Sequence, residues 1–588
     1  MNKKPKSSTV WNCIFLGHIY MHMYISMRNY YTLHLKILQI LMMKSNAAND
    51  CVKVLSDGLN RLFANREPWQ VSIITATTVL STLWVWRIIN QDECIWIRTR
   101  RQFFRQLRKL PLVRDKIEKK LNQATKDFEG EIVKSCANLS YFLELPKKGL
   151  TKDQIIAIVD EHLSISPYDW HKGRVSGAVY GYKKDLVELL TAVYGKALYT
   201  NPLHSDVFPG ICKMEAEVVR MACTIFHGNV ESCGTMTTGG TESIIMACKA
   251  YRDYARVNKG ITSPNMVVPR TAHAAFDKAS QYFNIHVQYI DVDPQTMEVD
   301  FKAVKRSVNK NTILLVGSAP NFPYGTIDNI EEIAGLGVKY NIPVHVDACL
   351  GSFLVAFISE AGYSVKPFDF AVQGVTSISA DTHKYGFAPK GSSLVLYSDK
   401  KYRNHQFTVT TDWPGGVYGS PTVNGSRAGG IIAACWATMM SYGFNGYLEA
   451  TKRILDTARY VERGVRKVDE IYVFGKPATS VIAIGSKVFD IFRLSDALCK
   501  AGWNLNALQF PSGIHICITD MHTGPGIADK FLTDLQDAVS EIMLNPTQPV
   551  EGKMAIYGVA QSISDRSVVG EVARCYLGSL YYTPKRIN

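Results

Sequence analysis

The sequence predicts an α/β protein whose mostly parallel sheet is flanked by helices and followed by a smaller α+β domain. Short apolar runs alternate with longer helical periods over the middle of the chain, as in a parallel sheet with helical connections. From about Ile431 the pattern changes to one long helical stretch followed by closely spaced apolar runs. The composition supplies enough core material, because 46% of the 588 residues are hydrophobic and only 20% are charged.

The central region contains five apolar runs that we predict as strands, with helical periods between them. The strands are Asn265–Val268, His286–Ile290, Thr312–Val316, Pro343–Val346 and Ser393–Tyr397. The helices are Thr241–Val257, Phe276–Phe283, Phe301–Val308 and Ile327–Tyr340. Ligands of parallel sheets bind at the carboxyl ends of the strands, so the residues after each run are the first candidates for a site.

The C-terminal region is predicted as a long helix, Ala433–Val465, then the runs IYVFG, TSVIAIGS and IHICIT, and a terminal helix at Asp529–Met543. N-terminal to the sheet, a basic stretch from about Arg98 to Ser135 has a helical pattern. The predicted division is an N-terminal segment (1–67), a membrane helix (68–90), a basic helical linker (91–170), a large domain (171–430) and a small domain (431–588).

The positive charge of the chain is concentrated near one end. The net charge is +14, but residues 1–120 hold 20 Lys and Arg against 7 Asp and Glu, whereas the remainder holds 46 against 45. A nearly neutral body disfavours nucleic-acid binding. The 13 cysteines form no CxxC pair, which argues against a zinc module or a disulfide framework and favours a reducing compartment. We therefore predict neither a nucleic-acid partner nor a metal site.

An uncharged segment, Pro68–Trp86, lies within the basic region and predicts a transmembrane helix over residues 68–90. Its 19 residues nearly span a hydrocarbon core of about 30 Å, and tryptophans at both ends suit the membrane interfaces. A buried core helix is the alternative. More arginines follow the segment than precede it, so its C-terminal side is predicted to be cytoplasmic. Residues 11–43 fit either an amphipathic surface segment or an upstream extension.

A glycine turn, Gly239-Gly240-Thr241, directly precedes a predicted helix. Glycines allow backbone amides to approach an anion closely, and the helix N-terminus adds partial positive charge, so a phosphate is the expected ligand. The motif is neither GxGxxG nor a P-loop, which argues against a dinucleotide or nucleoside-triphosphate site. An ordinary glycine turn with a threonine cap gives the same pattern.

Two charged residues follow predicted strands. Asp347 ends the run PVHV, where its carboxylate can hold a cation or a protonated heterocyclic nitrogen, or merely cap a helix. Lys384 lies in SADTHKYG, where partial desolvation can lower the pKa of an amine enough for Schiff-base formation. A lone lysine there would more often be a surface charge.

The combination and order of these residues favour an electron-sink cofactor that carries a phosphate, an aromatic ring, a pyridine nitrogen and an aldehyde. In the favoured assignment Gly240 and Thr241 hold the phosphate and His273 stacks on the ring. Asp347 pairs with the pyridine nitrogen, and Lys384 reacts with the aldehyde.

Eight stretches resemble the sphingosine-1-phosphate lyases, which are fold-type-I pyridoxal-phosphate enzymes. They are SGAVYGY, NPLHSDVFPG, TTGGTES, TAHAAFDKA, HVDACLGSF, SADTHKYGFAPKGSS, TDWPGGVYGSPTVNGSRAGG and WNLNALQFPSGIHICIT. The resemblance, which runs from about Glu67 to the C-terminus, implies retro-aldol cleavage of a phosphorylated sphingoid base to a long-chain aldehyde and phosphoethanolamine. It also implies a homodimer with shared active sites, and an endoplasmic-reticulum anchor with a cytosolic catalytic body. Residues 171–430 would then be the pyridoxal-phosphate-binding domain.

Within the resembling motifs, Lys390 is the candidate cation for the substrate phosphate, with Tyr180 and His204 at the same end. His383 is assigned to the cofactor, and Ser426 is expected to reach the cofactor of the neighbouring subunit. Lys384, once released as an amine, is a candidate for the base that takes the 3-hydroxyl proton or for a later reprotonation.

Two other functions stay open. An amino-acid decarboxylase of the same fold would share the cofactor residues but would need an arginine for the substrate carboxylate, and Arg427 is the candidate in the core motifs. A membrane-tethered scaffold would keep the fold without the chemistry. The intact Lys384, Asp347 and His273 argue against such a scaffold.

Overall fold

The chain divides into two compact units, Met1–Gln106 and Leu107–Asn588. The computed structural model describes residues 53, 56–58, 60–61, 63–89, 95–550 and 565–584. The prediction for residues 11–43 lies outside the described residues. The first unit contains helix α3 (Pro68–Ile89) and nearly all of helix α4 (Ile95–Leu107).

The structure does not support the predicted transmembrane helix. Residues Pro68–Ile89 do form a helix, but in the part of the chain that is described no helix is both long enough and apolar enough to cross a bilayer. The physical reason lies in the composition of α3, where four threonines, two serines and Gln70 interrupt the aliphatic side chains and lower the mean hydropathy.

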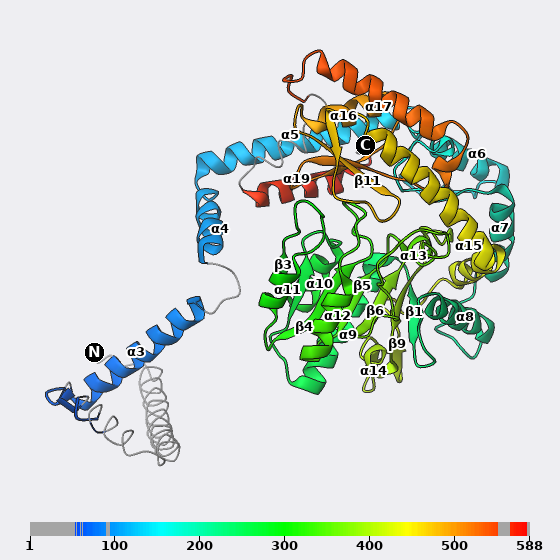
Figure 1. Cartoon of the computed structure of the whole chain (residues 1–588). Helices are drawn as coiled ribbons and strands as arrows, with labels where there is room; N and C mark the ends of the chain where they lie inside the picture. Colours follow the sequence, from blue (N-terminus) through cyan, green and yellow to red (C-terminus); the bar gives the residue numbers. More distant parts are fainter. Residues whose placement is uncertain are drawn as a thin grey trace, which may run out of the picture. The chain divides into compact units, whose positions relative to one another are not determined.

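The five predicted strands belong to a seven-stranded sheet in the second unit, with the order β1-β7-β6-β5-β4-β2-β3 (Figure 1). Its strands are β1 (Cys233–Thr237), β2 (Asn265–Pro269), β3 (His286–Ile290), β4 (Thr312–Ser318), β5 (Val344–Asp347), β6 (Val375–Ala380) and β7 (Ser393–Tyr397). β3, β2, β4, β5 and β6 are parallel to one another, and β7 is antiparallel to both β6 and β1. The predicted mostly parallel α/β sheet is confirmed.

Sequence patterning did not indicate β1 or β6, which are short and contain threonines and serines. β7 runs antiparallel because residues 381–392 connect it to β6 without a crossover helix, whereas parallel neighbours need a longer connection. This tight connection contains His383, Lys384 and Lys390, so the departure from a purely parallel sheet positions the predicted lysines.

Helices connect the strands and cover both faces of the sheet. They are α9 (Gly240–Lys259), α10 (Ala275–Phe283), α11 (Phe301–Ser307), α12 (Ile330–Tyr340), α13 (Ser352–Val355) and α14 (Lys400–Arg403). Alternate residues of β7 enter different clusters: Val395 and Tyr397 pack with α9 and α10, whereas Leu394 and Leu396 join the larger core on the other face. This alternation is the period-two pattern of a strand buried on both sides.

The C-terminal region contains helix α15 (Gly429–Val465) and a four-stranded antiparallel sheet in the order β10-β11-β13-β12. The elements of this sheet region are β10 (Ile471–Val473), β11 (Val481–Ser486), α16 (Ile491–Lys500), β12 (Asn506–Leu508), β13 (Gly513–Cys517), η2 (Asp520–Thr523) and α17 (Ile527–Met543). The long predicted helix is two helices that meet at Gly443, whose φ of +57° interrupts the helical geometry. A hairpin of β8 (Thr408–Thr410) and β9 (Tyr418–Ser420) precedes α15.

The second unit begins with helices that precede the main sheet. They are α5 (Pro111–Ser135), α6 (Lys152–Ser164), the short η1 (Trp170–Lys172), α7 (Lys184–Ala197) and α8 (Pro209–Ile225). The basic stretch predicted as one helix is broken before Pro111, which starts α5 at the position where proline is tolerated. The last described helix, α19 (Arg566–Ser579), contacts α5, and Arg108 pairs with Asp565 at 2.9 Å. The predicted boundaries at 170/171 and 430/431 remain predictions.

Candidate active site

The carboxyl ends of four strands meet at one edge of the main sheet. β1 is followed by the glycine turn at Gly239, β2 by the loop that contains His273, β5 ends at Asp347, and β6 is followed by Asp381. β1 points the same way as the parallel strands because β7, its neighbour, is antiparallel to both. The edge is therefore the ligand-binding position expected for an open α/β sheet.

A cavity of about 710 Å³ lies at this edge, a volume within the usual range for small-molecule sites. It brings together six of the predicted site residues: Gly240, Thr241, His273, His383, Lys384 and Lys390. The residues come from three separate stretches of sequence, and only the fold places them around one space.

The glycine turn is closely packed against side chains from two other loops. A Cβ added to Gly240 would lie 2.7 Å from the Cys349 sulfur and 2.8 Å from a carboxylate oxygen of Asp381, so no larger residue fits. Gly240 is the first residue of α9, where backbone N–H groups lack partners within the helix. Glu242 stabilises the turn, because its Oε2 accepts hydrogen bonds from the Thr238 N–H at 2.7 Å and the Thr238 hydroxyl at 2.6 Å.

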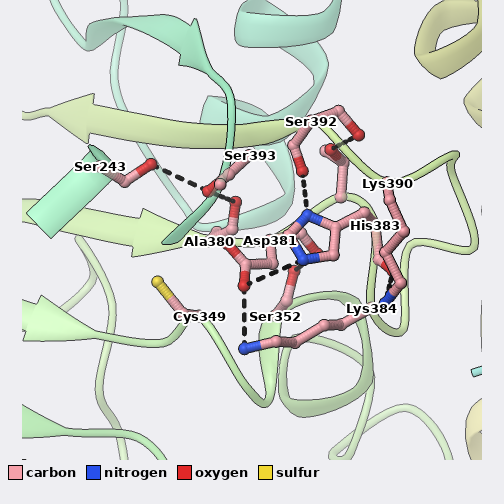
Figure 2. Close-up of polar contacts among 12 residues, drawn as sticks. Ser243, Cys349, Ser352, Ala380, Asp381, His383, Lys384, Lys390, Ser392 and Ser393 are labelled. Carbon is pink, nitrogen blue, oxygen red and sulfur yellow. Dashed lines mark hydrogen bonds and ion pairs between the residues drawn. The ribbon is translucent and has the colours of Figure 1, made fainter. Parts of the chain in front are cut away.

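Lys384 points into the cavity and pairs with Asp381, with 2.9 Å between Nζ and Oδ2 (Figure 2). Burial is the largest single influence and lowers the pKa of this amine, but the groups that face it, Asp381 foremost, together raise the pKa above its ordinary value. Desolvation does act to lower the pKa of Lys384, but the net shift in the protein alone is upward, so the predicted lowering of this pKa is not met. The reason is a neighbour three residues away in sequence that the pattern did not identify as a partner.

The His383 ring lies beside this ion pair and is fixed by a hydrogen bond on the side away from it. Its Nδ1 donates to the Ser392 carbonyl, because a carbonyl only accepts, and this leaves Nε2 facing Asp381 at 3.7 Å. Burial lowers the His383 pKa despite the nearby carboxylate. The neutral ring then presents a lone pair towards the cavity, which it lines.

Asp347 is oriented by neutral donors. Its Oδ1 accepts from the Cys349 N–H at 3.1 Å and the Ser379 hydroxyl at 3.2 Å. His345 stands behind Ser379, with Nε2 at 3.1 Å from the Ser379 oxygen and Nδ1 at 2.7 Å from Ser377. Asp347 is 7% exposed and does not itself line the cavity, but Cys349, which packs beside it, does.

Lys390 and Tyr180 lie together near the lysine turn. The Lys390 ammonium is 5.0 Å from the centre of the Tyr180 ring and donates to the His383 carbonyl at 3.4 Å. Burial and the nearby charge of Lys384 lower the pKa of Lys390. Burial raises the pKa of Tyr180, whose ring stacks edge-on against Tyr385 at 4.9 Å.

Two predicted residues lie apart from the main cavity. His204 is exposed in the loop between α7 and α8 and does not line it. Ser426 is also exposed, and it lines an adjoining cavity of about 330 Å³ that shares Thr238 and Glu242 with the first.

Sequence reasoning assigned no role to three buried residues of the site: Asp381, Glu242 and Cys349. For two of them, Asp381 and Glu242, the spacing in the sequence could have indicated a role. Asp381 lies three residues before Lys384, and Glu242 lies within the first turn of the helix after the glycines, so both spacings place side chains on one turn. Cys349 gave no signal, because only the fold packs it against Gly240.

The edge can hold a phosphate at the glycine turn, an aldehyde at Lys384 and a cationic ring nitrogen at Asp347. The cavity of about 710 Å³ and the buried, unpartnered Oδ1 of Asp381 on its wall fit an enclosed ligand there. Pyridoxal phosphate carries all three groups, and the fold and site together define a fold-type-I pyridoxal-phosphate enzyme. In agreement, the family model described as "Pyridoxal-dependent decarboxylase conserved domain" matches residues 140–485.

Curated relatives narrow this class. The sphingosine-1-phosphate lyase of Drosophila melanogaster is 71% identical over 544 residues, covering 92% of this chain and 100% of the relative. Sphingosine-1-phosphate lyase 1 of Rattus norvegicus is 50% identical and covers 88% of this chain and 91% of the relative. The chain therefore belongs to the sphingosine-1-phosphate lyase family, and its cofactor is pyridoxal phosphate.

Solved structures agree with this assignment. The Burkholderia pseudomallei sphingosine-1-phosphate lyase superposes with a TM-score of 0.70 at 38% identity, covering 76% of this chain and 99% of that one. A glutamate decarboxylase of Lactobacillus brevis superposes with a TM-score of 0.59 at 22% identity, covering 68% of this chain and 95% of that one. The second likeness concerns the fold alone.

Proposed function

We propose that this chain is a pyridoxal-phosphate-dependent lyase that cleaves sphingosine 1-phosphate and related phosphorylated sphingoid bases. The products are a long-chain aldehyde and phosphoethanolamine. The observation that carries this proposal is the placement of Lys384 in a cavity bounded by the glycine turn, in a chain 71% identical to a sphingosine-1-phosphate lyase.

The cofactor, when bound, supplies an electron sink for the pair released as the substrate's carbon–carbon bond breaks. In this proposal Gly240 and Thr241 bind its phosphate through the start of α9, and His273 stacks on its ring. Asp347, held by the Cys349 N–H and by Ser379, keeps its carboxylate ready for the ring nitrogen. Lys384 forms the covalent attachment.

The phosphate of the substrate needs its own cation, and we assign it to Lys390. Lys390 lines the cavity but forms no carboxylate pair within the described residues, so its charge is available to an anion. Tyr180 and His204 are proposed at the same end. Tyr180 supports this placement through its ring contact with the Lys390 ammonium.

The decarboxylase alternative requires an arginine that is free to hold a substrate carboxylate. Arg427 donates to Glu215 at 2.5 Å, and it does not line the main cavity. Its charge is already compensated by a carboxylate. This pairing favours the lyase over a decarboxylase that would use Arg427.

We also infer that two copies of the chain share their active sites. His204 and Ser426 are exposed on the single chain, which suits residues that act across an interface. An apolar groove of about 470 Å³, which includes Leu145, Leu150 and Ile155, also lies on the surface of the single chain, where a second copy would cover it. Mixing Lys384→Ala protein with Ser426→Ala protein tests this inference, because shared sites would restore one intact site in a mixed dimer.

For location we propose the cytosolic face of the endoplasmic reticulum, as the family resemblance implies. The strongly basic sequence from Arg98 to Lys120 suits a surface of anionic headgroups. Fractionation of cells that express the tagged chain, with and without a high-salt wash, measures this association.

The test of function is a comparison of substrates. The purified protein is incubated with pyridoxal phosphate and either a phosphorylated sphingoid base or single amino acids. Release of long-chain aldehyde and phosphoethanolamine is expected from the first and no carbon dioxide from the second. Carbon dioxide release without aldehyde would favour the decarboxylase. A colourless protein that binds no pyridoxal phosphate would contradict the proposal that the chain is an enzyme.

A further inference from the structure

Asp381 has no part in the function proposed above, yet it is the most enclosed charged group at the site. The residue is 1% exposed and directly follows β6, at the start of the turn that contains Lys384. Its carboxylate lies against Gly240, so it faces the same space as the glycine turn.

The two oxygens of this carboxylate differ in their surroundings. Oδ2 pairs with the Lys384 ammonium at 2.9 Å, whereas Oδ1 is buried without a hydrogen-bond partner in the described part of the chain. The hydroxyl of Ser393 donates to the Ala380 carbonyl at 3.3 Å (Figure 2), and it also lies close enough to Asp381 to help lower the pKa of that carboxyl. Burying a carboxylate without compensation is costly, so the contact with Lys384 carries most of its stabilisation.

The other titratable groups that face this pair do not replace Lys384. His383 is neutral and turns a lone pair towards Asp381, because its Nδ1 carries the proton that bonds the Ser392 carbonyl. The remaining groups near the pair are Tyr180, Cys349, Cys517 and Lys390. Burial raises the pKa of Tyr180, Cys349 and Cys517, so these three are neutral, and Lys390 is a like charge to Lys384.

We propose that Asp381 is a positioning residue that keeps the Lys384 amine protonated from its release by the substrate until the carbon–carbon bond has broken. Lys384 then acts as the proton donor late in the reaction and not as the base that takes the 3-hydroxyl proton. The inference rests on the proposed function and decides between the two roles that the sequence left open for Lys384.

The protons balance in this order of events. When the substrate nitrogen replaces Nζ on the cofactor carbon, the three protons of the substrate ammonium pass to Nζ, which becomes the ammonium that Asp381 stabilises. Another base takes the 3-hydroxyl proton as the carbon–carbon bond breaks. This base is a histidine or a phosphate oxygen of the cofactor or substrate. The electron pair of that bond stays on the carbon next to nitrogen.

Lys384 then gives one proton to that carbon, so that an N–H bond breaks and a C–H bond forms. The resulting neutral amine is the form that displaces the product nitrogen from the cofactor, and its two protons pass to that nitrogen. The proton held by the other base completes the ammonium of phosphoethanolamine. Asp381 remains charged throughout and takes no proton.

The test measures Lys384 in the cofactor-free protein and does not depend on turnover. Pyridoxal phosphate is added between pH 7 and 10.5, the reaction is stopped with borohydride after short times, and mass spectrometry measures the labelled Lys384 peptide. The neutral amine reacts, so the initial rate of the wild-type protein is expected to rise about tenfold per pH unit and to keep rising to pH 10. In Asp381→Asn, burial acts without a counter-charge, so labelling at pH 7 is expected to be at least about tenfold faster and to level off at a lower pH.

Ser352→Ala is the matched control. Its hydroxyl donates to the Asp381 backbone carbonyl at 2.8 Å, so this variant disturbs the same turn but keeps the carboxylate. Its pH profile is expected to follow the wild type. Superimposable profiles for the wild type and Asp381→Asn would overturn the inference, as would a wild-type profile that levels off below pH 9. Failure to label Lys384 at any pH would instead contradict the proposed function.

Stability gives a second measurement on the cofactor-free protein. Lys384→Met leaves the buried Asp381 without its counter-charge and Asp381→Asn leaves the half-buried Lys384 without its own, so each is expected to lower the melting temperature. The double variant is expected to melt above the temperature that the two separate losses predict. Additive losses would show that the pair is not coupled and would overturn the inference. If Asp381→Asn does not fold, the wild-type labelling profile decides by itself.

Discussion

The neighbouring parallel strands β5 and β6 both lead into a buried aspartate at the same edge of the sheet, but the two carboxylates have different partners. Asp347, at the end of β5, accepts hydrogen bonds from a backbone N–H and a serine hydroxyl, which are neutral. Asp381, directly after β6, pairs with the ammonium of Lys384.

This difference shows that the position of an aspartate at the end of a strand does not by itself define what its carboxylate binds. A carboxylate held by neutral donors keeps its charge available for a cation from outside the chain, whereas one that faces a lysine has already been neutralised by the chain itself. The four predictions below test this contrast and its surroundings, from the largest expected effect to the smallest.

Replacing Lys384 with alanine removes both the proposed point of covalent attachment and the counter-ion of Asp381. Turnover is expected to fall by a factor on the order of 10⁴ or more, and borohydride should no longer fix pyridoxal phosphate to this peptide. Absorption spectra and peptide mass spectra measure both effects. A Lys384→Ala protein that still turns over phosphorylated sphingoid base would show that another group performs this chemistry.

Replacing Asp347 with asparagine keeps the shape of the side chain but removes the charge meant for the ring nitrogen. Attachment of the cofactor to Lys384 should persist, while turnover is expected to fall about 10²- to 10³-fold, because a fixed charge in an enclosed site is lost. Attachment and turnover are measured on the same sample. If this variant shifts the pH profile of Lys384 labelling as far as Asp381→Asn does, the contrast between the two aspartates fails.

Replacing Lys390 with alanine removes the proposed cation for the substrate phosphate. The expected result is a rise in KM for phosphorylated substrate of roughly 10- to 100-fold, as for the loss of a hydrogen bond to a charged group. The cofactor should remain bound, as followed by its absorption. Lys390→Arg keeps the charge and serves as the control, and loss of cofactor in Lys390→Ala would show that this lysine belongs to the cofactor site.

The smallest effect at neutral pH concerns His345, which lies behind Asp347 through Ser379. Burial lowers the His345 pKa from 6.5 to about 4. Between these values the unfolded chain binds a proton that the folded protein does not, so stability falls as the pH falls through this window. This histidine should account for about 2 kcal/mol of the stability lost between pH 7 and pH 5.

Urea unfolding of the wild type and His345→Gln at both pH values measures that contribution. The variant should lose less stability between pH 7 and pH 5 than the wild type does. His162→Gln, at an exposed histidine of α6, is the control and should behave as the wild type. Equal losses in the wild type and in His345→Gln would contradict the linkage.

Much of the fold was predictable, because strand and helix periods are local properties of the chain. β3 and β7 have the predicted bounds, and α9 to α12 begin within three residues of the predictions. β1 and β6 were missed because their polar residues are buried by neighbouring strands, which no local pattern contains. The predicted membrane span is not supported, because the many hydroxyl side chains of α3 lower its hydropathy and none of the described helices is long and apolar enough to cross a bilayer.

The sequence by itself determined which residues are available for chemistry: the glycine turn, His273, Asp347, Lys384 and Lys390, each identified by local spacing or by family motif. The tertiary structure alone decided how these groups are paired. It placed Asp381 and Cys349 against Gly240, and Arg427 against Glu215. The physical reason is that the charge state of a buried group depends on neighbours within a few ångströms in space. Those neighbours come from separate strands and turns that only folding brings together.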